Sequence, residues 1–299
     1  MNPLEAIAGA LASGSYTAGW AVVKGLPEPV ARRLFDAGAD LAVLRGGAGI
    51  DRLRANLARV APGEELIREA VRSYARYWCE AFRLPALRPE RILEGTVAPA
   101  LHLLTDSVAS GRGTVMALSH SGNWDMAGAW AGLSGIRFTT VAERLKPESV
   151  FEKFVAFRES LGMEVLPLTG GERPPYEVLT ERLRAGGSVC LLADRDLTPR
   201  GIDVEFFGAT ARMPAGPARL ALQTGANLLP VTLSFTPDGW ELAFHPYVAH
   251  TDLPTMTQDV ARAFEKGIRE HPADWHMLQR LWLDDLAVDD PRRQRQGTA

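Results

Sequence analysis

The sequence predicts an α/β fold in which helices flank a central, mostly parallel β-sheet and a helical extension precedes the sheet. Three observations support this prediction. From about residue 100 onward, short apolar segments alternate with helical ones, which is typical of a layered α/β sheet. Before that point, long amphipathic helical patterns dominate. The 299 residues are 46% hydrophobic and 23% charged, an ordinary globular composition that excludes a disordered chain, a collagen-like repeat and a coiled coil.

The helical extension is expected over residues 1–95 and contains two amphipathic helices. The first, over 28–44, ends at a glycine cluster and has an apolar face formed by Val30, Leu34, Ala37, Leu41 and Leu44. The second, over 64–82, has an aromatic face beside a stripe formed by Arg68, Arg72 and Arg76. Rings beside guanidinium groups suit a helix that docks on a bilayer surface, where arginines meet lipid phosphates. A helix packed on the core with solvated arginines is the alternative that this pattern leaves open.

The α/β part is expected over residues 96–285 and is followed by a flexible tail over 286–299, in one structural domain overall. Its strands are expected at 114–119, 138–142, 164–167, 188–193, 227–235 and 240–247. Its helices are expected at 124–133, 149–161, 175–185, 217–224 and 258–270.

Charge and cysteine content narrow the choice of partners. The formal net charge of −3 offers no positive field for nucleic acid, so nucleic acid is not expected as a partner. Cys79 and Cys190 are too few for a disulfide framework and too far apart for a zinc motif, so free thiols in a reducing compartment are expected. His271 and His276 are five residues apart and share no helical face, and no metal is predicted.

The N-terminal third is mildly basic. Residues 1–93 carry 13 Lys and Arg against 10 Asp and Glu, or +3, which leaves −6 for the remainder. An uncharged stretch over 6–23 is diluted by polar residues and glycine, whereas a spanning helix needs about 20 mostly apolar residues. These observations favour a chain that rests on an anionic membrane surface over one that spans the bilayer.

The sharpest local pattern is the segment from Ser119 to Asp125, which follows one expected strand and precedes a helix. Gly122 permits a bend and Asn123 can cap the helix, so the turn can bring the Asp125 carboxylate to the His120 imidazole. Such a pair is a general base with its orienting partner. The same pair could serve stability alone. The Gly-x-Ser-x-Gly elbow of the α/β-hydrolases is missing, which disfavours a serine hydrolase.

The spacing His-x4-Asp after an apolar strand resembles the signature of the glycerolipid and lysophospholipid acyltransferases. Further blocks resemble the branch that contains the lipid A late acyltransferases, and they lie at 157–162, 193–196, 204–208, 213–218 and 275–278. From about residue 16 to 283 the chain is most similar to the actinobacterial phosphatidylinositol mannoside acyltransferases. A set of blocks in this order is far more specific than the short motif alone.

This resemblance implies a glycerolipid-acyltransferase-like fold and transfer of a fatty acyl group, such as palmitoyl, from acyl-CoA to a mannose hydroxyl of a phosphatidylinositol mannoside. It implies a peripheral enzyme at the cytoplasmic face of the plasma membrane, with acyl-CoA as donor substrate and no cofactor. His120 matches the family's general base and Asp125 its orienting partner. Positions that line or brace the family's site are matched by Glu143, Arg158, Asp194 and His276, and the family often has Glu where this chain has Asp194.

Donor binding requires an apolar channel and positive groups for the CoA phosphates. Candidates for the phosphates are Arg144, Lys146, Lys153, Arg158 and Arg195, and the turn adds Ser121 and Asn123 as substrate-binding candidates. Backbone N–H groups near Gly122, or a nearby arginine, could stabilise the oxyanion. The structural alternatives are solvated surface arginines, salt-bridge partners at Glu143 and Asp194, and a core histidine at His276.

Three functional alternatives stay open. The acceptor could be another glycolipid or a lysophospholipid. The chain could be a non-catalytic lipid-binding module that keeps the fold and an apolar groove. Thioester hydrolysis, with water in place of the sugar, is the third.

Overall fold

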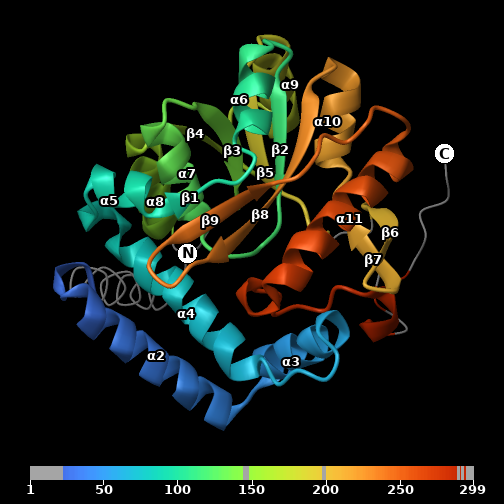
Figure 1. Ribbon diagram of the computed structural model, residues 1–299. Coiled ribbons are helices and arrows are strands. Elements are labelled where there is room, and N and C mark those ends of the chain that lie inside the picture. Colours follow the sequence, from blue (N-terminus) through green and yellow to red (C-terminus); the bar gives the residue numbers. More distant parts are fainter. Residues whose placement is uncertain (1–22, 144–147, 197–199, 288–289, 291–292, 294–299) are drawn as a thin grey trace, which may run out of the picture.

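The structure, a computed structural model, describes residues 23–143, 148–196, 200–287, 290 and 293. Its centre is a seven-stranded sheet in the order β1-β9-β8-β2-β5-β3-β4 (Figure 1). The strands are β1 Thr96–Val97, β2 Thr114–Leu118, β3 Phe138–Ala142, β4 Met163–Pro167, β5 Ser188–Leu192, β8 Asn227–Phe235 and β9 Trp240–Phe244. Neighbouring strands are parallel except for β8 and β9. The predicted mostly parallel sheet is confirmed.

Helices cover both faces of the sheet, because successive side chains of each strand point to opposite sides. On β2, Val115 and Ala117 face one core, whereas Met116 and Leu118 face the other. The first core is closed by α9 Pro175–Arg184, α10 Gly216–Thr224 and α11 Leu253–Glu270. The second is closed by α5 Pro89–Glu94, α6 His102–Ala109, α7 Trp124–Leu133 and α8 Glu148–Ser160.

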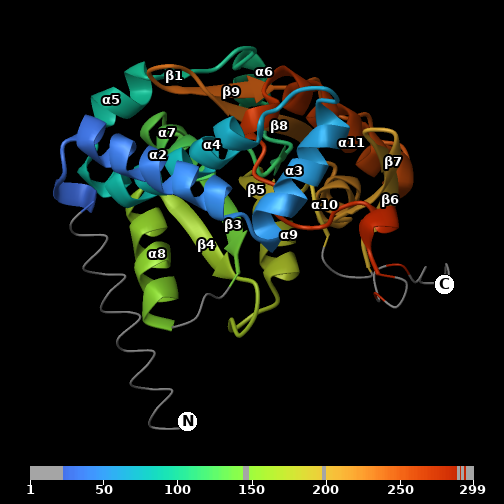
Figure 2. The same cartoon turned by 90° about the horizontal axis from the view of Figure 1, so that it is seen from below.

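The N-terminal part is formed by α2 Glu28–Arg45, α3 Ala48–Val60 and α4 Ile67–Arg83. The three helices share a small core, and α4 crosses the carboxyl end of the sheet, with α2 lying outside it (Figures 1 and 2). The residues of α2 that are buried are small, Ala31 and Ala39. Its predicted apolar face therefore lies in solvent, with Val30, Leu34, Leu41 and Leu44 exposed by 43%, 58%, 45% and 84%.

The arginine stripe of α4 bonds to other parts of the protein. Arg68 and Arg72 both donate to the Asp40 carboxylate of α2, each through Nε and Nη2, at 2.6 to 2.9 Å. Arg76 donates to the carbonyl oxygens of Thr236 and Gly239 in the turn between β8 and β9, both at 2.9 Å. The structure thus favours the alternative in which this helix packs on the core. Its arginines form hydrogen bonds and ion pairs within the protein.

Some elements differ from the sequence prediction. Helix α3 and the antiparallel hairpin of β6 Ile202–Phe206 and β7 Ala209–Met213 are not among the elements predicted from the sequence. Helix α11 begins five residues before the predicted start, because Asp252 caps it by accepting a hydrogen bond from the Thr255 N–H at 3.0 Å. Within the described residues, no helix has the length and apolar content that crossing a bilayer requires.

Candidate active site

A helix cap and a closely packed glycine fix the turn between β2 and α7. Asn123 caps α7, because its Oδ1 accepts from the Met126 N–H at 3.0 Å, while its Nδ2 donates to Glu80 at 2.9 Å. Gly122 has a φ of +52°, and a Cβ there would lie 2.8 Å from the carbonyl carbon of Leu233. That position therefore requires glycine. The predicted bend and cap are confirmed, and they leave His120 at the end of β2.

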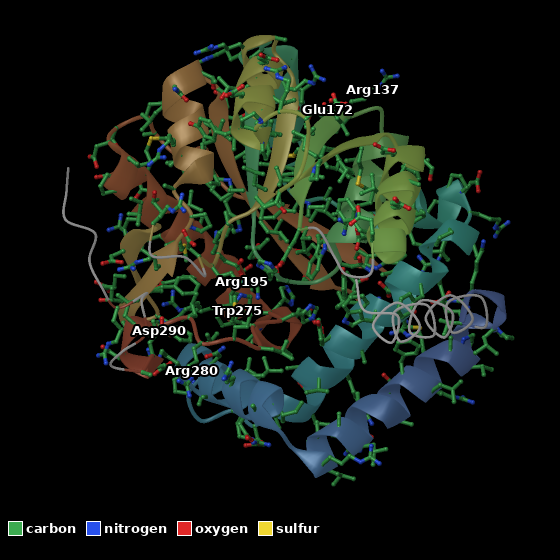
Figure 3. The ribbon with its side chains drawn as sticks, turned by 180° about the vertical axis from the view of Figure 1, so that it is seen from behind. Arg137, Glu172, Arg195, Trp275, Arg280 and Asp290 are labelled. Atoms are coloured by element: carbon green, nitrogen blue, oxygen red, sulfur yellow. The ribbon has the colours of Figure 1, made fainter. Side chains whose placement is uncertain are left out.

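His120 pairs with Asp194, which follows β5. The parallel neighbours β2 and β5 run in register, so the residues that follow them meet. The Nδ1 atom of His120 hydrogen-bonds Oδ1 of Asp194, and the His120 backbone N–H donates to Oδ2 at 2.8 Å. The indole N–H of Trp275 donates to the same oxygen at 2.9 Å. Arg195 and Trp275 lie at this end of the sheet in Figure 3.

Asp194 is fully buried, and its partners keep it charged. Burial would raise the pKa of this carboxyl group, but the facing His120 ring and the hydrogen bonds from His120 and Trp275 outweigh that effect and lower the pKa. The carboxylate therefore accepts the Nδ1 proton of His120, which leaves the Nε2 lone pair for chemistry. The Asp194 side chain is thus long enough to reach the imidazole.

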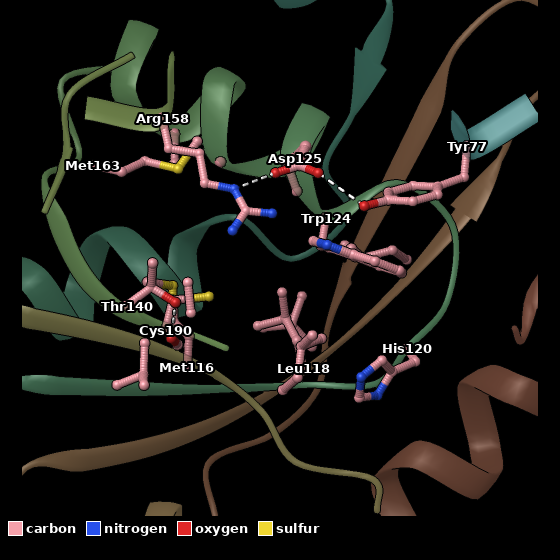
Figure 4. A pocket seen from close by; sticks show the side chains of 18 of the residues that line it. Tyr77, Met116, Leu118, His120, Trp124, Asp125, Thr140, Arg158, Met163 and Cys190 are labelled. Carbon is pink, nitrogen blue, oxygen red and sulfur yellow. Dashed lines mark hydrogen bonds and ion pairs between the residues drawn. The ribbon is translucent and has the colours of Figure 1, made fainter. Parts of the chain in front are cut away.

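Asp125 does not orient His120, which corrects the pairing expected from the sequence. Its Oδ2 accepts from the Tyr77 hydroxyl at 2.9 Å and its Oδ1 accepts from Arg158 Nε at 2.7 Å. Figure 4 shows this carboxylate between Arg158 and Tyr77, with the His120 ring at a distance from it. The physical reason is the helix direction: the first turn of α7 faces α4 and α8, whereas His120 faces the end of β5.

An apolar cavity of about 430 Å³ lies between the sheet and helices α7 and α8, and His120 is in its wall. Its apolar lining includes Met116, Leu118, Gly128, Trp130, Phe138, Phe151, Val155, Met163, Cys190, Val231, Leu233 and Phe244. Its polar lining and further aromatic residues include Tyr74, Tyr77, Trp78, Trp124, Asp125, Glu143, Arg158, Arg195, His276 and Gln279. A pocket of this kind suits a long apolar ligand with a polar reacting end.

The remaining candidates from the sequence fall into two groups. Glu143, Arg158 and Arg195 line the cavity, and Arg195 also bonds Gln279. Ser121 and Asn123 are each 3% exposed and are not among the residues that line the cavity. Both brace the turn, so the structure does not place them as substrate-binding groups.

The basic candidates before and within α8 are not covered by the described structure. Arg144 and Lys146 lie outside the described residues, and the side chain of Lys153 is outside them as well. Their proposed contact with CoA phosphates stays a prediction. Among the described residues, there is no group of three or more His, Cys, Asp or Glu side chains that could hold a metal ion.

His276 lies in the cavity wall, within an aromatic cluster that the sequence analysis does not predict. Its backbone N–H donates to the His120 carbonyl oxygen at 2.8 Å, and its ring centroid lies 5.2 Å from that of Tyr74. Trp124 lies 5.8 Å from the His120 ring and 4.1 Å from the Tyr77 ring. The aromatic face of the 64–82 segment is the sequence feature from which this cluster could have been predicted. In the structure it faces the candidate site.

Comparison with known proteins identifies the family. Residues 11–284 match the family of bacterial lipid A biosynthesis acyltransferases. The chain is 52% identical to a phosphatidylinositol mannoside acyltransferase of Mycolicibacterium smegmatis, over 95% of this chain and 94% of the relative. It is 48% identical to a phosphatidylinositol mannoside acyltransferase of Mycobacterium tuberculosis, over 96% of this chain and 93% of the relative. The chain therefore belongs to the bacterial lipid A biosynthesis acyltransferase family, and it is an acyltransferase.

Proposed function

We propose that this acyltransferase moves a fatty acyl group, such as palmitoyl, from acyl-CoA to a mannose hydroxyl of a phosphatidylinositol mannoside. The observation that carries the proposal is His120 in the wall of an apolar cavity, with its ring held from behind by the buried Asp194. The acceptor follows from the two relatives, which are named for that lipid and align over nearly the whole chain.

His120 acts as the general base in this proposal. Its Nε2 takes the proton of the mannose hydroxyl while the sugar oxygen attacks the thioester carbonyl carbon and forms the new C–O bond. The tetrahedral intermediate collapses with loss of the C–S bond, and the imidazolium gives its proton to the departing thiolate, which leaves as free CoA. Asp194 holds the ring by Nδ1 and stabilises its positive charge. No covalent acyl-enzyme is needed.

The cavity separates the two ends of the donor. The apolar wall beneath α7 and α8 takes the acyl chain, and the polar part of the wall holds the thioester beside His120. Arg195, in the polar part of the wall, is the described candidate for the CoA phosphates, together with the sequence candidates Arg144 and Lys146. Asp125 positions the Arg158 guanidinium in the cavity wall rather than the imidazole.

The enzyme is proposed to work at the cytoplasmic face of the plasma membrane, bound peripherally. The supporting observation is the exposed apolar face of α2, of which Leu44 is 84% exposed and Leu34 58% exposed. Arg33 and Arg45 are exposed on the same helix and would meet anionic headgroups. This moves the docking surface from α4, where the sequence analysis placed it, to α2.

The catalytic assignment is tested by acyl transfer from palmitoyl-CoA to phosphatidylinositol mannosides, with products identified by mass spectrometry. His120→Ala should lower the transfer rate by about 10²- to 10⁴-fold, the usual contribution of a positioned base. Asp194→Asn should also lower it, because an amide does not stabilise the imidazolium.

The matched control is Glu181→Gln, a half-exposed carboxylate on α9 that pairs with Arg173 at the surface. It should transfer at the wild-type rate. A folded His120→Ala protein with wild-type transfer would refute His120 as the base. Turnover of palmitoyl-CoA by the wild type only to free acid, whatever lipid is offered, would refute the proposed acceptor.

A further inference from the structure

His276 is buried in the cavity wall, where aromatic rings surround its side chain. Its side chain and backbone together are 4% exposed. Its ring centroid lies 5.2 Å from that of Tyr74, 6.2 Å from that of Tyr77 and 6.4 Å from that of Trp124. The backbone N–H bond to the His120 carbonyl oxygen ties the two histidines to each other. The ring therefore has a fixed place beside the reacting centre.

The imidazole of His276 is neutral at physiological pH. Burial lowers its pKa to about 3, and the nearby His120 adds to the effect. A neutral imidazole has one N–H donor and one nitrogen lone pair, and the neighbours decide which nitrogen carries the proton.

Ser73 and Asp274 fix the proton on Nε2. The Ser73 hydroxyl donates to Oδ1 of Asp274 at 2.7 Å, and Oδ2 of that carboxylate accepts from the Phe235 N–H at 2.8 Å. A hydroxyl has a single proton, so the Ser73 oxygen, 2.9 Å from Nε2 of His276, accepts from that nitrogen. The lone pair of His276 is consequently on Nδ1.

That lone pair has no partner among the described residues. Nδ1 of His276 and Nη1 of Arg59 are the two buried side-chain atoms of the described chain without a hydrogen bond, and Arg59 does not line the cavity. Buried polar atoms are nearly always paired in native proteins, because an unpaired acceptor destabilises the fold. An exception in the wall of a binding cavity indicates that the ligand brings the donor.

We propose that Nδ1 of His276 accepts a hydrogen bond from a second hydroxyl of the acceptor sugar, beside the hydroxyl that His120 deprotonates. This inference rests on the proposed function. Nearby groups suit a sugar, because Tyr74, Trp78 and Trp124 offer ring faces in the same cavity wall. The rings around Nδ1 shield it from water, so the acceptor displaces one of the half-buried rings, which are Tyr74, Trp124 and Phe235. His276 thereby selects which hydroxyl is acylated.

The test uses acceptors from which single hydroxyls have been removed. Wild-type transfer should fall at least about tenfold for one monodeoxy mannoside lacking a hydroxyl that is not itself acylated. His276→Gln keeps a polar group near Ser73 but has no hydrogen-bond acceptor at the Nδ1 position. Its transfer rate should therefore fall little when the same deoxy mannoside replaces the full sugar. His276→Asn places its Oδ1 near the former Nδ1 and should retain the discrimination.

Two further readouts separate this role from a structural one. His276→Gln should raise the KM for the acceptor about tenfold and lower the ratio of transfer to acyl-CoA hydrolysis by a similar factor, as expected for one lost hydrogen bond. Fragmentation mass spectrometry of its product should show acylation at more than one position. His250→Gln, a histidine that bonds the Ala226 carbonyl oxygen outside the cavity, is the control.

Several outcomes would overturn the inference. If transfer and acyl-CoA hydrolysis fall equally in folded His276→Gln, the N–H group that bonds Nδ1 belongs to acyl-CoA, which contains amides, and not to the sugar. If removal of a sugar hydroxyl lowers the transfer rate equally in wild type and His276→Gln, His276 does not bond that hydroxyl. If His276→Gln does not fold, the wild type alone decides, because tolerance of every monodeoxy acceptor contradicts the proposal. A wild type without any transfer to phosphatidylinositol mannosides would instead refute the proposed function.

Discussion

At the scale of single residues, Asp125 is a buried carboxylate that pairs with neighbouring side chains and not with His120. It is 4% exposed, and its two oxygens are bound by Tyr77 and Arg158. Burial would lower the pKa of Arg158, but the Asp125 charge and hydrogen bond outweigh it and raise the pKa. Loss of either partner breaks this ion pair in a buried setting and leaves the other charge to its remaining contacts, which for Asp125 include the Tyr77 hydrogen bond.

We predict that Asp125→Asn and Arg158→Gln each lower the free energy of unfolding by about 3 kcal/mol, the range seen when one partner of a buried pair is removed. The double variant should cost at least about 1 kcal/mol less than the sum, because the pair is broken only once. Urea unfolding measures all three variants. Strictly additive losses would show that the two side chains do not stabilise each other.

His276 should make stability depend on pH. Its folded pKa, about 3, lies below the unfolded value of 6.5, so between these values the unfolded chain binds more protons and the free energy of unfolding rises with pH. Stability is therefore lost as pH falls below about 6.5, at up to about 1.4 kcal/mol per pH unit. Urea midpoints at pH 5 and 7 should differ less in His276→Gln than in wild type. An identical difference in both proteins would contradict the assignment.

At the scale of elements, the pairing of strands decides which residues meet. The sequence shows His120 and Asp125 five positions apart, and it shows Asp194 only as a carboxylate after another strand. Asp194 is the partner of His120 because β2 and β5 are neighbours in the sheet. The order of strands in a sheet cannot be predicted from the local spacing of apolar residues. The family resemblance pointed to both carboxylates but gave the orienting role to Asp125, whereas the geometry gives it to Asp194.

Three elements were predicted with the bounds that the structure shows. β3, β8 and α7 have the predicted bounds, because turn residues or a cap delimit each of them. The hairpin of β6 and β7 was missed although the segment 202–206 alternates in exposure, since it lies outside the main sheet and packs on α11. Helix α3 follows a glycine cluster that the sequence analysis interprets only as a turn.

At the scale of the whole molecule, the helical extension covers the site and presents an apolar face outward. The aromatic face of α4 lines the cavity, and its arginines bond Asp40 of α2 and the turn between β8 and β9. Reversing the charge of Arg68 or Arg72 would therefore also break ion pairs between α4 and α2, so it would not test lipid binding alone. The exposed leucines of α2 give the cleaner test.

We predict that Leu34→Glu combined with Leu44→Glu lowers partition onto anionic vesicles at least about tenfold, because two exposed apolar side chains that would enter the bilayer surface are replaced by charges. Vesicle co-sedimentation measures this. The control is Val108→Glu, at a 37% exposed apolar position on α6, a helix that lies at the opposite end of the sheet from α2 in Figure 1; this variant should bind normally. Retention of the double variant at the wild-type level would show that α2 does not dock.

The cavity has a consequence for how the enzyme can evolve. Met116, Leu118 and Phe138 line it and also belong to the buried cluster that holds α7 and α8 on the sheet. A substitution that widens the space for a longer chain removes contacts from the same core, at a cost that grows with the volume lost. Donor range and thermal robustness are thus coupled traits, and a lineage that broadens one must recover the other by stabilising changes elsewhere.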